Sequence, residues 1–154
     1  MGLPKILIEF KTLAETLIAR SERGIVAVIL KDNSNTTKTA VYTKESEIVK
    51  SHYTATNLAY LSLVFMGGPS KVIVERVQTS DDISDALERL KNKRWYYLAV
   101  HGLGDGETDT IVEYIKEQRT QYHKTFKAVL PLAAADNEGI INFATDNIKI
   151  GAKT

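Results

Sequence analysis

The run GIVAVILKD, residues 24–32, decides the fold of this chain. It is a nearly continuous series of apolar and largely β-branched residues, the pattern of a strand that is buried on both faces. Three further apolar runs follow it, KVIVERV (71–77), WYYLAV (95–100) and FKAVLPLA (126–133), and helix-like stretches separate them. Strands that alternate with helices are typical of right-handed βαβ crossovers. The sequence therefore predicts an α/β fold with a mostly parallel central sheet and flanking helices.

The apolar periodicities also set the expected bounds of the elements. Strands are expected at Ile25 to Leu30, Val72 to Val77, Tyr96 to Val100 and Lys127 to Leu130, with helices near 57–66, 81–91 and 107–119. A short strand is possible at Ala40 to Thr43, and Thr56 or Asn57 is expected to cap the first helix. Near the end, GIINFAT and NIKIG flank Asp146-Asn147, which predicts a C-terminal β-hairpin.

The first residues, MGLPKILIEF, form an apolar arm that nothing local can cover. Ile6, Ile8 and Phe10 alternate with Leu7 and Glu9, as on a strand with one apolar face. Such a terminal strand is either an edge strand of its own domain or donated to the sheet of another subunit. We expect residues 1–23 to form an extended arm and connector, with residues 24–154 as the α/β domain. The interface residues expected on the arm are Leu3, Ile6, Leu7, Ile8 and Phe10.

Composition excludes several functional classes. The 154 residues suit one domain, and a formal net charge of +1 gives no field that would attract nucleic acid or an anionic membrane. There are no cysteines, which rules out a disulfide scaffold and a thiolate metal site. The most apolar stretch, LAYLSLVFM, is too short to span a bilayer. We therefore expect a soluble protein made in the cytoplasm, without nucleic-acid binding or membrane insertion.

One stretch, HGLGDGETD at 101–109, has the composition of a site. It combines His101, Asp105, Glu107 and Asp109 with three glycines at the carboxyl end of a strand, where α/β proteins usually bind ligands. Its spacing matches neither a Rossmann glycine pattern nor a P-loop, and it lacks the paired histidines of a zinc site. Turn formation and helix capping are the favoured interpretation. A small-ligand-binding or enzymatic domain that uses the Gly102–Asp109 loop remains the alternative.

Three stretches carry a resemblance to a known family. They are MGLPKILIEFK (1–11), RGIVAVILKD (23–32) and KAVLPLAAADNEGIINFATDNIKIGAKT (127–154). In this order they resemble the N-terminal half of contractile tail sheath proteins, which occur in phages of Gram-positive bacteria and in phage-tail-like bacteriocins. The family pattern continues beyond the GAKT ending, so the resemblance implies a chain that is truncated at its C-terminus.

The resemblance implies a structural role. Sheath subunits stack as rings around a tail tube, exchange terminal strands and contract to drive the tube through a bacterial envelope. The implied partners are other copies of the chain, the tail tube protein and the baseplate. The implied location is the cytoplasm of the producing bacterium during assembly and then the phage tail or bacteriocin particle. No enzyme activity, catalytic residue, cofactor or metal is expected.

The sheath core of this family is described as subtilisin-like, which raises the question of a Ser-His-Asp triad. The chain has three histidines, His52, His101 and His123, and no serine in the glycine-framed turn of a nucleophile. The resemblance therefore implies the fold without the protease. The aromatic run Trp95-Tyr96-Tyr97 is expected to pack in the core, since no basic groove accompanies it as in a base-stacking platform.

Overall fold

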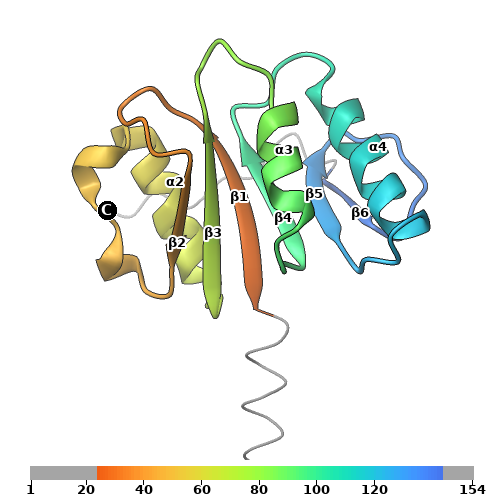
Figure 1. The fold of residues 1–154 in the computed structure, drawn as a ribbon, viewed down its shortest axis with the longest axis horizontal. Coiled ribbons are helices and arrows are strands. Elements are labelled where there is room, and N and C mark those ends of the chain that lie inside the picture. The colour runs from red at the N-terminus through yellow and green to blue at the C-terminus, as the bar shows by residue number, and fades with distance from the viewer. Residues whose placement is uncertain (1–23, 144–154) are drawn as a thin grey trace, which may run out of the picture.

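The computed structural model describes residues 24–143. A six-stranded sheet has the order β2-β3-β1-β4-β5-β6 (Figure 1). The only antiparallel pair among these strands is β2 with β3, and the other neighbours run parallel. The strands are β1 (Ile25–Lys31), β2 (Thr39–Tyr42), β3 (Lys71–Val77), β4 (Tyr97–His101), β5 (Lys127–Pro131) and β6 (Ile140–Phe143). The predicted α/β fold with a mostly parallel sheet is confirmed.

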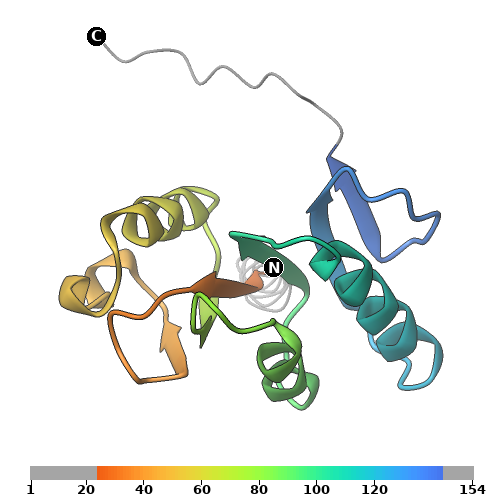
Figure 2. The same cartoon turned by 90° about the horizontal axis from the view of Figure 1, so that it is seen from above.

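Helices cover the sheet unevenly. Within residues 24–143, α2 lies on one face, whereas α3 and α4 lie on the other (Figure 2). Two short 3-10 helices, η1 (Glu45–Glu47) and η2 (Lys50–His52), precede α2. The α-helices are α2 (Ala55–Met66), α3 (Ser84–Lys91) and α4 (Glu107–Thr120). All three lie close to the ranges that the 3.6-residue periodicity predicts.

The interior divides into two apolar clusters, one on each face of the sheet. The larger cluster lies under α3 and α4, where the ring of Trp95 stacks on that of Phe126 at a centroid distance of 3.8 Å. The smaller cluster includes Leu61 of α2 and Val28 and Leu30 of β1. Because neighbouring residues of β1 face opposite ways and both sides are buried, GIVAVILKD is the doubly covered strand that its composition predicts.

Two helix starts differ from the sequence prediction. The N-cap of α2 is Thr54, whose side chain accepts a hydrogen bond from the Asn57 N–H at 3.3 Å, so Thr56 and Asn57 were the wrong choice. Asn57 instead has a buried amide that binds the end of β1. The second helix begins at Ser84 rather than 81, and Asp82 accepts a hydrogen bond from the Ser84 N–H. In both cases several neighbouring polar residues are suited to the N-cap position, so the sequence alone did not single out one of them.

The aromatic run is only partly buried. Trp95 is 1% exposed, and Tyr96 packs partly against the same cluster. Tyr97 is 38% exposed, so the prediction that it lies in the core was wrong. Its register partner Val26 is partly buried against the α2 side of the sheet. Within residues 24–143, Tyr97 is therefore less well covered than its neighbour Val26.

The two ends of the chain leave some predictions open. β6 pairs parallel with β5, which places the first half of the predicted hairpin in the sheet. The second half, NIKIG at 147–151, lies outside the described residues, and so does the N-terminal arm at 1–23. The hairpin, the arm and the subtilisin-like core therefore stay predictions.

Candidate functional site

Buried polar residues lie near the carboxyl ends of β1, β3 and β4, among them Asp32, Arg76 and Glu107. From β1 the chain continues to β2 and β3 on one side of the sheet, and from β4 it continues to β5 on the other. Ligands of α/β sheets bind where connections diverge in this way. Two open hollows lie here, of about 490 Å³ and about 470 Å³. The first is lined in part by Asp32, Arg76 and Arg89, and the second by Lys31 and the loop before α4.

The HGLGDGETD loop is closed by its own glutamate. Glu107 accepts a hydrogen bond from the Gly104 N–H and forms an ion pair with Lys31 Nζ at 2.8 Å. Gly106 has φ of +80°, a conformation that favours glycine, and leads directly into α4. This geometry agrees with the turn-and-cap interpretation, because the carboxylate joins the loop to the end of β1. The same ion pair leaves Glu107 poorly suited to bind a ligand cation.

The other polar residues of the loop do not gather around Glu107. Asp105 and Asp109 are exposed, and Asp109 lies in the first turn of α4, where a negative charge complements the helix dipole. The His101 ring stacks on Tyr60 of α2, with centroids 4.7 Å apart and an interplanar angle of 23°. The loop is therefore a structural turn with its histidine engaged on the α2 side.

Asp32, which follows β1, is a buried centre of hydrogen bonding that sequence reasoning missed. Its carboxylate accepts hydrogen bonds from the Ser34 N–H at 2.8 Å, the Thr54 N–H at 2.9 Å and the Asn57 amide at 2.6 Å. Burial alone would raise the pKa of this carboxyl, but the bonds from Asn57, Thr54 and Ser34 outweigh it and lower the pKa to about 2. The charged carboxylate thus holds the start of α2 against the end of β1.

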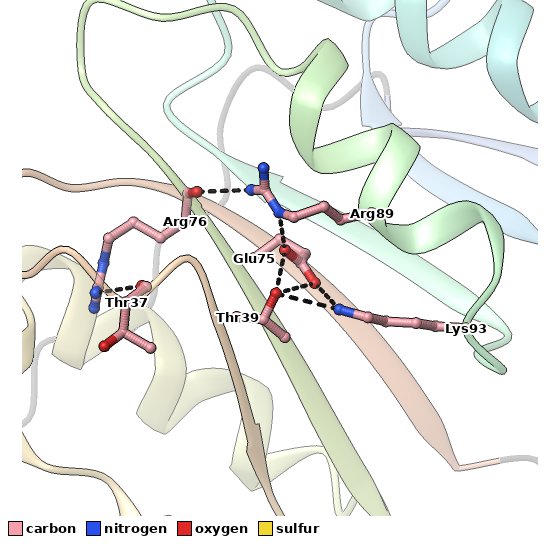
Figure 3. Close-up of polar contacts among 6 residues, drawn as sticks. All are labelled: Thr37, Thr39, Glu75, Arg76, Arg89 and Lys93. Carbon is pink, nitrogen blue, oxygen red and sulfur yellow. Dashed lines mark hydrogen bonds and ion pairs between the residues drawn. The ribbon is translucent and has the colours of Figure 1, made fainter.

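Glu75 of β3 forms the second buried centre (Figure 3). Its side chain is fully buried and accepts from Arg89 Nε at 2.6 Å, from Lys93 Nζ, and from Thr39 Oγ1 at 2.9 and 3.0 Å. Arg89 also donates to the Arg76 carbonyl at 2.8 Å. Burial of a carboxylate is costly unless cations and hydrogen bonds compensate it, and here two cations do so. The network joins β2, β3 and α3.

Arg76, the next residue of β3, points its guanidinium the other way. It donates to the carbonyls of Thr37 at 2.8 Å and His52 at 2.7 Å, and it lies 4.6 Å from the centre of the Tyr53 ring. Burial raises the pKa of Tyr53, and a hydrogen bond between its hydroxyl and that of Tyr42 at 3.0 Å adds to the effect. Arg76 therefore fastens the loop after β1 and the segment before α2 to the sheet.

The three histidines, which are the candidate catalytic or metal-binding residues, lie on different elements. His52 lies in η2, His101 in β4, and His123 beyond α4, with φ of +52°. No group of three or more histidines and acids that could hold a metal occurs within residues 24–143. Over the same range, every helix is too short or too polar to cross a membrane.

Fold and site together define an α/β scaffold, in which buried charged side chains form ion pairs and hydrogen bonds that hold loops and helices in place. A comparison with known family profiles found no match. The chain is, however, 39% identical to the tail sheath protein of Clostridium phage phiCD119 over an alignment of 157 positions, which covers 97% of this chain and 43% of that protein. This chain is therefore homologous to a phage tail sheath protein, as its resemblance predicted, and spans less than half of that relative's length.

Proposed function

We propose that this chain is a structural part of a contractile tail sheath, which polymerises around a tail tube and contracts to drive the tube through a bacterial envelope. The observation that carries the proposal is the 39% identity to a tail sheath protein over nearly the whole chain. The proposed partners are other copies of the chain, the tail tube protein and the baseplate. The proposed location is the virion tail, and the proposed role requires no catalytic residue.

The buried charges support a mechanical role. A sheath that shortens must move its subunits as rigid bodies and confine the change to the links between them. Glu75 joins β2, β3 and α3, while Asp32 and the Lys31–Glu107 pair join β1 to α2 and α4. Removal of one partner from such a buried contact strongly destabilises the fold, because the other partner is then left buried and uncompensated. The domain is thus suited to keep its shape while its contacts with neighbours change.

The links are proposed to be terminal strands. We assign residues 3–10 to a strand that pairs with a neighbouring subunit, and residues 24–154 to the domain that stacks in the rings. Main-chain hydrogen bonds of an added strand survive a change in the angle between subunits. Burial of each Ile or Phe of the arm would add about 1.5–3 kcal/mol, and repetition around a ring multiplies these contacts.

Electron microscopy of assemblies tests the proposal. We define the sheath chimera as the phiCD119 tail sheath protein in which this chain replaces the matched part. Produced with the tail tube protein of the same phage, the sheath chimera should form striated tubes, as should the unaltered relative. The proposed function would be contradicted if the unaltered relative forms tubes and the sheath chimera stays dispersed. Removal of residues 1–10 serves as the comparison, since it should leave a folded but non-assembling protein.

A further inference from the structure

One half of the sheet is covered on a single face only, within residues 24–143. Four large side chains on the same side of β4, β5 and β6 are 38–43% exposed, and together we call them the open face. Their register places them on one side, because Tyr97 pairs with Lys127, two residues before Val129. Val129 and Pro131 in turn pair with Ile141 and Phe143. The open face consists of Tyr97, Val129, Ile141 and Phe143.

The opposite side of β4 and β5 is largely buried. Leu98, Ala128 and Leu130, which alternate with the residues of the open face, are 0% exposed under α3 and α4. Strands of a parallel sheet normally carry apolar residues on both faces because helices cover both. Within residues 24–143, β4 and β5 have such a cover on one side alone. In that part of the chain, no element covers the open face.

The position of α2 indicates what kind of element fits. α2 lies on the same side of the sheet and reaches β4, where its Tyr60 stacks on His101 (Figure 2). A second helix beside α2, at the ~8–10 Å spacing of packed helices, would lie over the strands that α2 leaves open. In α2 itself, Leu63 and Met66 are 52% and 81% exposed.

We propose that the open face docks an amphipathic helix from the part of the sheath polypeptide that the relative has outside the matched region. This inference rests on the proposed function, and the relative supplies the length, since the alignment covers only 43% of it. A second copy of this chain is a poorer occupant. The exposed apolar area amounts to about 300 Å², well below the ~800 Å² that each partner buries in a stable dimer. A helix held on the same polypeptide needs far less area, because its effective concentration is high.

Cysteine labelling tests the proposal directly, because the chain has no cysteine of its own. Ile141→Cys is introduced into the isolated chain and into the sheath chimera, whose remaining cysteines are changed to serine, and maleimide labelling rates are measured on monomeric fractions. The matched control is Val41→Cys on β2, at the other edge of the sheet and 52% exposed. We expect the rate at 141 to fall at least about tenfold in the sheath chimera, with the rate at 41 changed less than about twofold.

Equal rates at 141 in the two proteins would overturn the proposal. Slower labelling of the Ile141→Cys isolated chain at higher concentration, abolished by the additional change Val129→Asp on the same face, would also overturn it, in favour of a second copy. If the sheath chimera does not fold, the unmatched part of the relative is produced separately and added to the isolated chain. Protection of position 141 then supports the proposal, and no protection contradicts it. Protection without tube formation under the microscope would refute the proposed function while leaving this docking surface supported.

Discussion

Replacement of Asp32 by asparagine removes one charge from a buried position and changes the shape of the side chain very little. The carboxylate receives three hydrogen bonds, from the Ser34 and Thr54 N–H groups and the Asn57 amide. An asparagine there would direct its NH2 group toward at least one of these donors. The Asp32→Asn variant should therefore lose stability through both the missing charge and an unpaired buried donor.

The magnitude follows from the pKa. A shift of the Asp32 pKa from 3.8 to about 2 corresponds to about 2.4 kcal/mol of stability at neutral pH. Because the folded pKa lies below the unfolded one, this stability is fully present above pH 3.8 and is lost as the pH falls toward 2. About 1 kcal/mol should be gone at pH 3. The variant should therefore be destabilised by about 2–4 kcal/mol at pH 7 and by less at pH 3.

Urea unfolding of both proteins at pH 7 and pH 3 measures this difference. The control is Asp81→Asn, an exposed residue at the same end of the sheet, which should change the free energy of unfolding by less than about 0.5 kcal/mol. The reasoning is refuted if the Asp32→Asn variant is as stable as the control. It is equally refuted if the loss is the same at both pH values, because the charge would then not be its source.

Three further predictions concern the ion pairs, the arm and the chemistry. Arg89→Met leaves the buried Glu75 with one cation fewer and should lower the free energy of unfolding, measured in urea, by about 2–3 kcal/mol. The control Glu88→Met should lower it by less than about 0.5 kcal/mol, and similar values for the two variants would contradict the role of the network. Deletion of residues 1–10 should leave the melting temperature nearly unchanged and abolish sheath formation, whereas a large drop would favour an edge strand of the same domain. The purified chain should bind no stoichiometric metal by mass spectrometry and hydrolyse no ester or peptide, and turnover that disappears in His101→Ala would disprove this.

The sheet could be predicted from sequence because each central strand is a contiguous apolar run. GIVAVILKD and KVIVERV lie in the structure as β1 and β3, within one residue of the expected bounds. The pattern within a run shows that both faces are apolar, but it does not show what covers each face. Tyr97 illustrates this, since an aromatic residue in an apolar strand suits a core position, yet its side chain is 38% exposed.

The buried polar centres could not be predicted because their partners are distant in sequence. Asp32 and Asn57 are 25 residues apart, and Lys31 and Glu107 are 76 apart. The acid within KVIVERV and the acid that ends GIVAVILKD look like ordinary strand charges until the helices are placed. The one local signal was the Asp-x-Ser spacing at 32–34, in which an aspartate can accept the N–H two residues later. That signal predicts a turn and says nothing of the bond to α2.

The uneven distribution of buried polar contacts predicts where this domain opens first. Asp32, Glu75 and the Lys31–Glu107 pair fasten the half of the sheet around β1 and β3, whereas β5 and β6 are covered by helices on one face alone within residues 24–143. Local opening is easiest where few buried contacts must be broken. Amide hydrogens of β5 and β6 should therefore exchange at least about tenfold faster than those of β1 and β3 in the isolated chain, and slow down selectively in the sheath chimera. Exchange at one uniform rate would show that the polar network does not divide the sheet in this way.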